Sequence, residues 1–192
     1  MIVFAREVFV CKCSTDVPRD DAGTGEGVRW LRGTEEHLSL VEPDYHTAAQ
    51  VDELRERLRR GDYWSIGMSG DRIVSCTWLH TRSEITYPYL PGCTFRVAAD
   101  VGYGYDAWTP PELRGGGLRR AGFLEELRVL REKGMAWEAS FFVRDQLEGA
   151  TRSLRKVGIE VVPLWRVHAV NRDTMEFEIL APDDSSTTRL GR

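Results

Sequence analysis

Hydrophobic residues recur along this chain with two different spacings, which together predict alternating strands and helices. Short apolar runs, and stretches where apolar and polar residues alternate, are typical of strands, whereas apolar residues three or four positions apart are typical of a buried helix face. The first pattern predicts strands at residues 2–13, 28–31, 63–68, 73–81, 94–100, 102–108, 137–143, 161–170 and 175–180. The second predicts helices at residues 34–40, 47–60, 118–133 and 145–157.

The order of these elements predicts the fold class. Turn residues at 69–72 and 171–174 indicate antiparallel hairpins, and strand–helix–strand units lie between them. We therefore expect an α+β (mixed α/β) fold with helices on both faces of the sheet. A doubly wound dinucleotide fold is disfavoured, because no Gly-x-Gly-x-x-Gly follows the first strand. The segment 83–92 contains two prolines and predicts an irregular loop that faces a substrate.

Two prolines and three glycines separate the strand at 102–108 from the helix at 118–133. Such a bend leaves backbone N–H groups without intrahelical partners, and the helix dipole adds positive potential there. Arg119 and Arg120 add two positive charges. The stretch 108–120 is therefore either a cradle for a phosphate group or a structural turn. It is not a Walker loop, because no Lys-Ser/Thr follows the last glycine.

Within this stretch, Thr109-x-Pro111-Glu112-Leu113-Arg114-Gly115-x-Gly117-Leu118 resembles the acyl-CoA loop of the GNAT (Gcn5-related N-acetyltransferase) superfamily. In that family a strand is followed by x-Pro-Glu-aromatic-Arg-Gly-x-Gly-Leu-Gly and then by a helix. Residues 59–78, 135–143 and 147–159 fit the elements that surround this loop in the family. The resemblance covers roughly residues 34–180. It implies a mostly antiparallel, twisted sheet that is splayed at the cofactor strand.

The resemblance also implies a co-substrate, acetyl-CoA or another acyl-CoA. Its pyrophosphate would lie on the N–H groups of residues 115–120, and its pantetheine arm would pair with the strand end at 107–109. The acyl carbonyl would point at a backbone N–H near Thr109, and an amine would attack the thioester directly. The cofactor-binding residues that the resemblance implies are Ala107, Trp108, Thr109, Arg114, Gly115, Gly116, Gly117, Leu118, Arg119 and Arg120.

The chain departs from the family pattern at three positions. Arg119 stands where the family usually has Gly or Ala, so its side chain either points away from the pyrophosphate or adds a contact to it. Leu154 stands where many members have a tyrosine that protonates the leaving thiolate, and leucine cannot do so. The asparagine often found near Leu147 is absent as well.

Four residues are candidates for the general base. Asp106 lies on the cofactor strand, where a carboxylate also has structural uses. Tyr103 and Tyr105 share a strand face, and each is either a base or a packed aromatic residue. Glu138 lies on the strand that follows. His80 is a weaker candidate, because a lone histidine on a strand is more often a packed residue.

Composition restricts the class of protein. The chain has 192 residues, of which 42% are hydrophobic and 29% charged, and we expect one domain at residues 1–182 with a flexible tail at 183–192. A net charge of −4 gives no electrostatic footprint for nucleic acid, and the arginines at 55–60 alternate with acids as on a solvated helix face. No apolar run is long enough to cross a membrane, and no secretory segment is present, so we expect a cytoplasmic protein. Cys11 and Cys13 favour free thiols over a zinc site, and we expect no metal.

The resulting hypothesis is an N-acetyltransferase that moves an acetyl or other acyl group to a primary amine of a small molecule or peptide. The oligomeric state is open, a homodimer included. Two alternatives remain. One is a non-catalytic CoA-binding or sensor domain, which the absence of a tyrosine at Leu154 favours. The other is an acyltransferase whose donor is an acyl carrier protein, with an acidic face that would meet Arg119 and Arg120.

Overall fold

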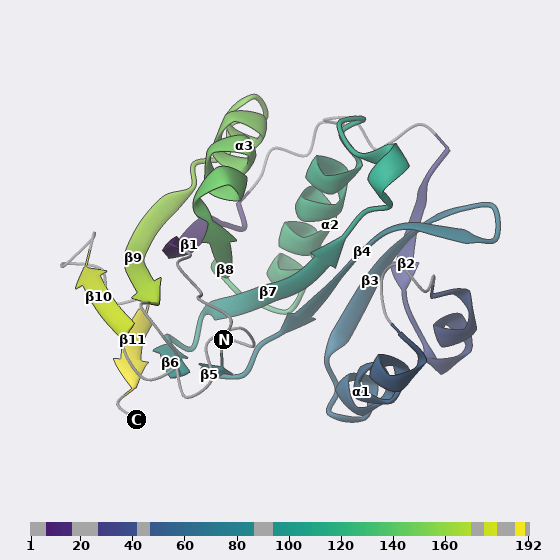
Figure 1. Cartoon of the computed structure of the whole chain (residues 1–192), viewed down its shortest axis with the longest axis horizontal. Helices are drawn as coiled ribbons and strands as arrows, with labels where there is room; N and C mark the ends of the chain where they lie inside the picture. The colour runs from purple at the N-terminus through teal and green to yellow at the C-terminus, as the bar shows by residue number, and fades with distance from the viewer. Residues whose placement is uncertain are drawn as a thin grey trace. The chain divides into compact units, whose positions relative to one another are not determined.

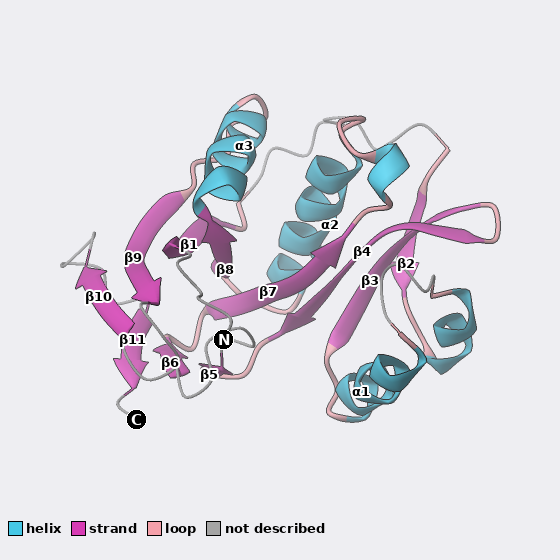
Figure 2. Cartoon of the chain, viewed as in Figure 1, coloured by secondary structure: helices cyan, strands magenta, loops and turns pink. Residues whose placement is uncertain are grey.

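The structure, a computed structural model, describes residues 7–16, 27–41, 47–86, 94–169, 175–179 and 187–190 (Figure 1). The chain folds as two compact units. The first unit contains residues 1–18, 81–103 and 130–192, and the second contains residues 19–80 and 104–129. Figure 2 shows the strands and helices of both units. The expected elements at residues 2–6, 87–92 and 171–174 lie outside the described residues.

In the second unit the strands lie in the order β7-β4-β3-β2, and β2, β3 and β4 pair in antiparallel fashion. Strand β7 (Val101–Trp108) belongs to this unit from Gly104 onward. Helix α2 (Leu118–Glu132) belongs to it up to Val129. The other elements are β2 (Arg29–Arg32), the 3-10 helix η1 (Glu35–Leu40), α1 (Ala48–Arg59), β3 (Tyr63–Ser69), β4 (Arg72–His80) and the 3-10 helix η2 (Pro111–Leu113).

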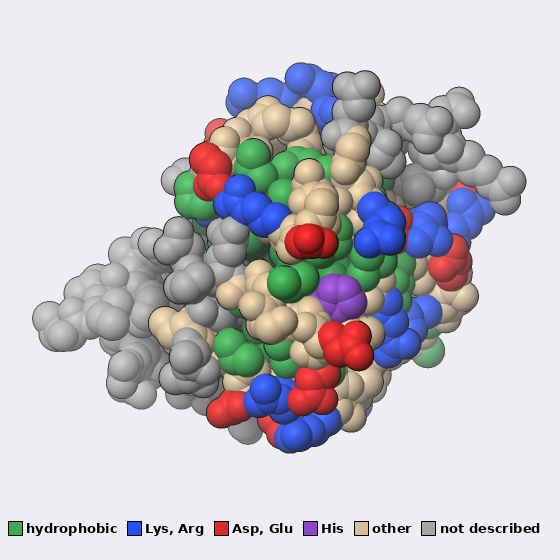
Figure 3. Space-filling model, turned by 90° about the vertical axis from the view of Figure 1, so that its right-hand side faces the viewer, with side chains coloured by type: hydrophobic (Ala, Val, Ile, Leu, Met, Phe, Trp, Pro, Cys, Tyr) green, Lys and Arg blue, Asp and Glu red, His purple; other side chains and the backbone are tan. Residues whose placement is uncertain are grey.

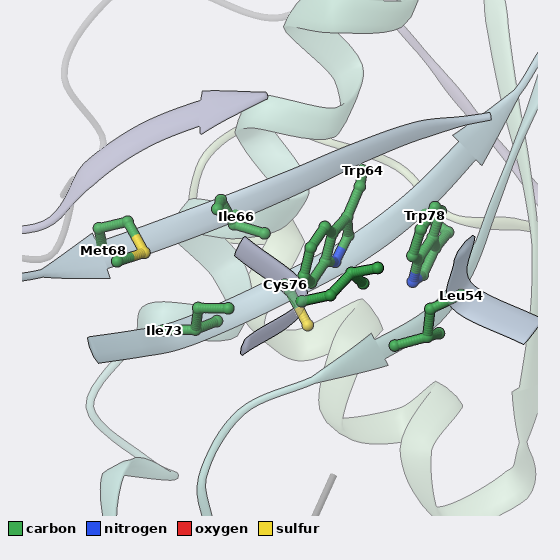
Figure 4. Packing of buried hydrophobic residues seen from close by; sticks show 8 residues of the cluster. Leu54, Trp64, Ile66, Met68, Ile73, Cys76 and Trp78 are labelled. Atoms are coloured by element: carbon green, nitrogen blue, oxygen red, sulfur yellow. The ribbon is translucent and has the colours of Figure 1, made fainter. Parts of the chain in front are cut away.

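One face of this sheet is apolar and is covered by α1. Figure 4 shows apolar side chains of β3 and β4 on this face, together with Leu54 of α1. The rings of Trp64 and Trp78, which are opposite each other in the β3–β4 register, stack with centroids 5.2 Å apart and planes 6° apart. Leu54 and both tryptophans are fully buried. This contact therefore forms the hydrophobic core of the second unit.

The opposite face of the same strands carries small and polar residues and is covered by α2. A Cβ atom on Gly122 of α2 would lie only 3.0 Å from the Trp30 ring and 3.3 Å from Ser75 Oγ. The absence of a side chain at Gly122 therefore lets α2 approach the strands closely. Helices cover both faces of the sheet in this unit, which confirms that part of the fold prediction.

In the first unit, strands lie in the order β10-β9-β1-β8-β7, and a smaller sheet has the order β11-β6-β5. All described pairs are antiparallel except β7–β8, which is parallel and covers Val101–Tyr103. Helix α3 packs on β8 and β1. The elements are β1 (Glu7–Ser14), β5 (Glu84–Thr86), β6 (Thr94–Val97), β8 (Trp137–Val143), α3 (Arg144–Arg155), β9 (Val162–Ala169), β10 (Met175–Ile179) and β11 (Thr187–Leu190).

Two segments differ from the sequence prediction. Residues 84–86, predicted as part of an irregular loop, form β5, because Ile85 is buried and pairs with Phe95 of β6. Residues 187–190, predicted as part of a flexible tail, form β11 on the other edge of β6. A short strand of this kind is held by backbone hydrogen bonds and needs no apolar pattern of its own. The expectation of a single domain at residues 1–182 stays a prediction.

Candidate functional site

The described pairing of β7 with β8 stops before the end of β7. On its other side β7 lies next to β4. The pairing of β7 with β8 ends at Tyr103, before the part of the strand that belongs to this unit begins. An edge strand presents N–H and C=O groups that can pair with an extended ligand. Residues 104–108 lie beyond the described pairing of β7 with β8.

The backbone of β7 changes conformation at Asp106. Its φ angle is +51°, and among the described residues no other non-glycine residue has a positive φ. Consecutive side chains of a regular strand point to opposite faces, yet Tyr105 and Asp106 both contact Arg57 of α1. Arg57 Nη1 donates to Asp106 Oδ2 at 2.5 Å, and the Arg57 guanidinium lies 5.2 Å from the centroid of the Tyr105 ring. The left-handed residue therefore interrupts the alternation at the end of the strand.

The bend after β7 is held by bonds within the second unit. The Arg114 side chain donates from Nε to the Thr109 carbonyl at 3.1 Å, and Arg72 forms an ion pair with Glu112. Thr109 is buried, with its hydroxyl 3.4 Å from Ser75 Oγ of β4. These contacts fix both ends of η2, so the glycines that follow start from a defined position.

The three glycines at 115–117 leave the backbone bare. Gly115 and Gly117 have φ angles of +85° and +86°, a conformation that side chains disfavour. A Cβ at Gly115 would have no neighbouring atom within 4 Å. Among the described residues, no backbone carbonyl accepts a hydrogen bond from the N–H groups of residues 115–120, and the first such donor is Ala121, which bonds to the Gly117 carbonyl at 3.0 Å. Successive N–H groups without a partner at the start of a helix are an arrangement that can bind anions.

The two arginines at the start of α2 point in different directions. Arg119 forms an ion pair with Glu126, two turns along the helix, and its guanidinium lies 5.4 Å from the centroid of the Phe123 ring. The guanidinium of Arg120 instead lies over Gly117, with Nη2 3.5 Å from the place of a Cβ there. Its Nε is buried and has no hydrogen-bond partner among the described residues. Of the two alternatives for Arg119, the structure therefore favours the one in which it points away from the glycines.

Tyr105 is a hydrogen-bond donor in this structure. Its hydroxyl donates to Asp62 Oδ2 at 2.6 Å, and the Asp62 carboxylate is fully buried. Burial and this hydrogen bond raise the pKa of Tyr105 above its ordinary value. His80 is nearby, with its ring centroid 5.8 Å from that of Tyr105. The second unit thus brings together Tyr105, Asp106 and His80, of which Tyr105 is already a donor to Asp62.

The other two candidate bases belong to the first unit. Tyr103 is buried and meets Phe141 edge to face, with centroids 5.5 Å apart. Glu138 is fully buried and accepts a hydrogen bond from Ser140 Oγ. Leu154 is also buried in this unit, with 3% of its surface exposed. The proposed catalytic roles of all four candidates stay predictions.

Sequence reasoning missed Arg57 and Asp62. The arginines of α1 were assigned to a solvated face, and this is wrong for Arg57, which is 7% exposed. Arg55 and Arg59 do form ion pairs with acids of the same helix, and Figure 3 shows basic and acidic side chains next to each other on this face of the molecule. The available signal was spacing, because residue 57 lies three positions after the buried Leu54 and so shares its helix face.

Cys11 and Cys13 are buried and form no disulfide, and burial raises the pKa of Cys11. No three His, Cys, Asp or Glu side chains gather as a metal site within the described ranges. None of the helices in the described part of the chain has both the length and the apolar character needed to cross a bilayer.

Comparison with known proteins identifies the fold. A scan against models of protein families finds no match, and a search of curated proteins finds none either. The fold does resemble solved structures. One is a GCN5-related glucosamine N-acetyltransferase region of a fungal multi-domain GH3 β-N-acetylglucosaminidase, which is 13% identical with a TM-score of 0.57 over 82% of this chain and 20% of that one.

Two further structures agree with it. A GCN5-related N-acetyltransferase from Sphaerobacter thermophilus is 17% identical, with a TM-score of 0.54 over 83% of this chain and 49% of that one. An N-acetyltransferase from Staphylococcus aureus is 11% identical, with a TM-score of 0.50 over 68% of this chain and 82% of that one. This chain thus spans a fifth of the first structure and about half of the second. It has the fold of the GCN5-related N-acetyltransferases, which confirms the predicted resemblance and the α+β class.

Proposed function

We propose that this protein is an N-acyltransferase that transfers an acetyl or other acyl group from coenzyme A to a primary amine. The observation that carries the proposal is the set of free N–H groups at residues 115–120, with the Arg120 guanidinium over Gly117. A pyrophosphate matches this arrangement, because it offers several anionic oxygens to donors that the protein does not itself use.

The rest of the cofactor would follow β7. The pantetheine arm carries amide groups, which would pair with the edge of β7 at Ala107, Trp108 and Thr109. The other residues proposed to hold the cofactor are Arg114, which anchors the bend through the Thr109 carbonyl, and Leu118 at the start of α2. Arg119 would contribute its backbone N–H but not its guanidinium, since the guanidinium is paired with Glu126.

The proposed reaction is direct acyl transfer. The amine nitrogen attacks the thioester carbonyl carbon, the C–S bond of the intermediate breaks, and the thiolate of coenzyme A leaves. Backbone N–H groups at the end of β7 would stabilise the oxyanion. The proton lost by the amine goes to a base, for which Asp106 and His80 lie in the second unit. Leu154 cannot protonate the thiolate, so another group or water would serve as the acid.

Two other functions follow from the same loop. A sensor that binds coenzyme A without turnover needs the free donors but no base. An acyltransferase that takes its acyl group from an acyl carrier protein would meet an acidic protein face with Arg120. The acceptor, a small-molecule or peptide amine, and the dimeric and cytoplasmic expectations stay predictions.

Two measurements on the whole chain separate these functions. Isothermal titration calorimetry with coenzyme A and with acetyl-CoA measures binding, and the release of free thiol over a panel of primary amines measures turnover. We expect binding of both ligands and thiol release that depends on the amine. Binding without thiol release for any amine would support the sensor. No binding of coenzyme A, together with thiol release from an acetylated carrier protein, would support the third function.

A further inference from the structure

Arg57 connects α1 to the irregular part of β7. Its guanidinium donates to Asp106 at 2.5 Å and to Glu53 at 2.8 Å and 3.2 Å. The same group lies 5.4 Å from the Trp78 ring centroid and 5.2 Å from that of Tyr105. Its side chain is 9% exposed, against 18% for Asp106 and 60% for Glu53. Arg57 is therefore bonded to two carboxylates and close to two aromatic rings, which limits its freedom to turn elsewhere.

Asp106 needs such a partner. A residue with a Cβ atom disfavours the left-handed conformation, and aspartate adopts it only when its surroundings hold it there. Arg57 can hold Asp106 in this conformation through the carboxylate, because the guanidinium donates a hydrogen bond to Oδ2. Loss of the guanidinium would remove this hydrogen bond from Oδ2 and let the backbone relax towards an extended conformation.

That return would turn the backbone groups that follow. Peptide planes on either side of a residue rotate when its φ and ψ change, so the N–H groups of Ala107, Trp108 and Thr109 would point in new directions. On the function proposed above, on which this step rests, these are the groups that meet the pantetheine arm and the acyl carbonyl. An error of about 1 Å in such a position can cost roughly a hundredfold in rate.

We infer that Arg57 is a positioning residue for acyl transfer, because it holds Asp106 of β7 in the left-handed conformation and so aims the backbone N–H groups of residues 107–109. It touches neither the acyl group nor the amine. A purely structural role is the competing account, in which Arg57 only packs on Trp78 and Tyr105. The two accounts differ in whether the effect of Arg57 passes through Asp106.

The test compares Arg57 variants in two backgrounds. Arg57→Met keeps a long apolar side chain over the rings but removes the hydrogen-bond donors, and Arg57→Lys keeps the charge without the planar fork. Asp106→Gly provides the second background, because glycine adopts a φ of +51° without an anchor. Arg59→Met is the matched control, since Arg59 is an exposed arginine of the same helix paired only with Glu56 among the described residues.

Three quantities are measured for each variant. Amide hydrogen exchange at residues 107–109 reports on the strand itself and needs no activity. Calorimetry gives the dissociation constant of coenzyme A, and thiol release gives kcat and KM. For Arg57→Met in the natural background, we expect exchange to rise about tenfold or more, kcat to fall roughly 10–100-fold, and the dissociation constant to stay within about threefold. Arg57→Lys should recover part of kcat, and Arg59→Met should change nothing.

The decisive comparison is the effect of Arg57→Met after Asp106→Gly. In the Asp106→Gly background, we expect Arg57→Met to change the exchange rates and kcat by about threefold or less, because the carboxylate through which Arg57 acts is absent. An equal loss in both backgrounds, or unchanged exchange in Arg57→Met, would overturn the inference. If turnover of the Asp106→Gly protein is too slow to measure, the exchange rates make the same comparison. If the wild-type protein does not release thiol, the proposed function is refuted. The exchange rates then still test whether Arg57 holds Asp106 in its left-handed conformation.

Discussion

The Tyr105 hydroxyl donates a hydrogen bond of 2.6 Å to the carboxylate of Asp62, which has no exposed surface. The phenol is therefore committed as a donor at neutral pH, and its raised pKa makes it a poor base. Tyr105 and Asp106 both lie close to Arg57, but the Tyr105 hydroxyl donates to Asp62 while the Asp106 carboxylate accepts from Arg57.

The Tyr105–Asp62 bond predicts how stability depends on alkaline pH. An unfolded chain loses the tyrosine proton near pH 10, whereas the folded chain retains it to higher pH, so the stability contributed by this group is present below about pH 10 and is lost as the pH rises further. The free energy of unfolding of the wild-type protein should thus fall more steeply than that of Tyr105→Phe above pH 10. At pH 8 the variant should be less stable by about 1–3 kcal/mol. Urea unfolding at pH 8 and at pH 11 measures both effects, and parallel curves would contradict them.

Gly117 gives a direct test of the pyrophosphate position. Gly117→Glu places a carboxylate beside the free N–H groups of the loop, where it repels a diphosphate and occupies the donors itself. We expect calorimetric affinity for coenzyme A to fall by about a hundredfold or more. The matched control is Gly134→Glu, which has a similar φ of +81°, open space around the new side chain, and a place after the other end of α2. Both variants should lose similar stability, and only the first should lose affinity.

Arg120 and Arg119 should differ in their effect on cofactor affinity. Arg120→Gln removes the guanidinium over Gly117, and we expect a loss of roughly 10–100-fold in coenzyme A affinity, as for a charge-assisted hydrogen bond. Arg119→Gln should change affinity by less than about threefold, because Arg119 is paired with Glu126. The affinity of Arg120→Gln should also depend less on salt. Equal losses in the two variants would mean that Arg119 turns to the loop when the ligand binds.

The conformation of the loop was predictable from sequence because it depends on residues within the loop itself. Proline and glycine set the backbone conformation of a bend directly, and a helix start leaves free N–H groups whatever surrounds it. The left-handed conformation of Asp106 was not predictable in the same way. Glycine is the usual sequence signal for a positive φ, and this position has none. Its conformation depends on Arg57, which lies 49 residues away in the sequence.

Residues that act through tertiary contacts were the ones missed. Two adjacent arginines look equivalent in sequence, yet Arg119 is directed by Glu126 and Arg120 is not. Asp62 follows a glycine and looks like a turn residue, and only the fold buries it beneath Tyr105. Strand β11 was missed for a related reason, because its pairing with β6 depends on the partner and not on its own polar pattern.

Glu126 predicts a stability change in the acid range. Burial raises the pKa of this fully buried carboxyl, and Arg119 opposes the shift. The folded chain then keeps a proton that the unfolded chain loses near pH 4.3, so the stability from this group is present below that pH and is lost as the pH rises. Relative to Glu126→Gln, the wild-type protein should lose stability between pH 4 and pH 8, and Arg119→Gln should lose more. Unfolding in urea across this range measures the difference, and identical pH profiles for wild type and Glu126→Gln would contradict it.

Leu154 tests whether the missing tyrosine of the family can be restored. Many proteins with the resembled loop have a tyrosine here that protonates the thiolate, but in this chain the position is 3% exposed on α3, within the first unit. A larger, polar side chain would overpack this site and bury a hydroxyl, so Leu154→Tyr should cost about 1–3 kcal/mol of stability. Because the side chain points into the core, we expect no gain in kcat in the thiol-release assay. Leu154→Met serves as the volume-conserving control and should cost less than about 1.5 kcal/mol. A tyrosine variant that kept its stability and released thiol several times faster would instead place residue 154 next to the leaving group, and would make water an inferior acid in the natural protein.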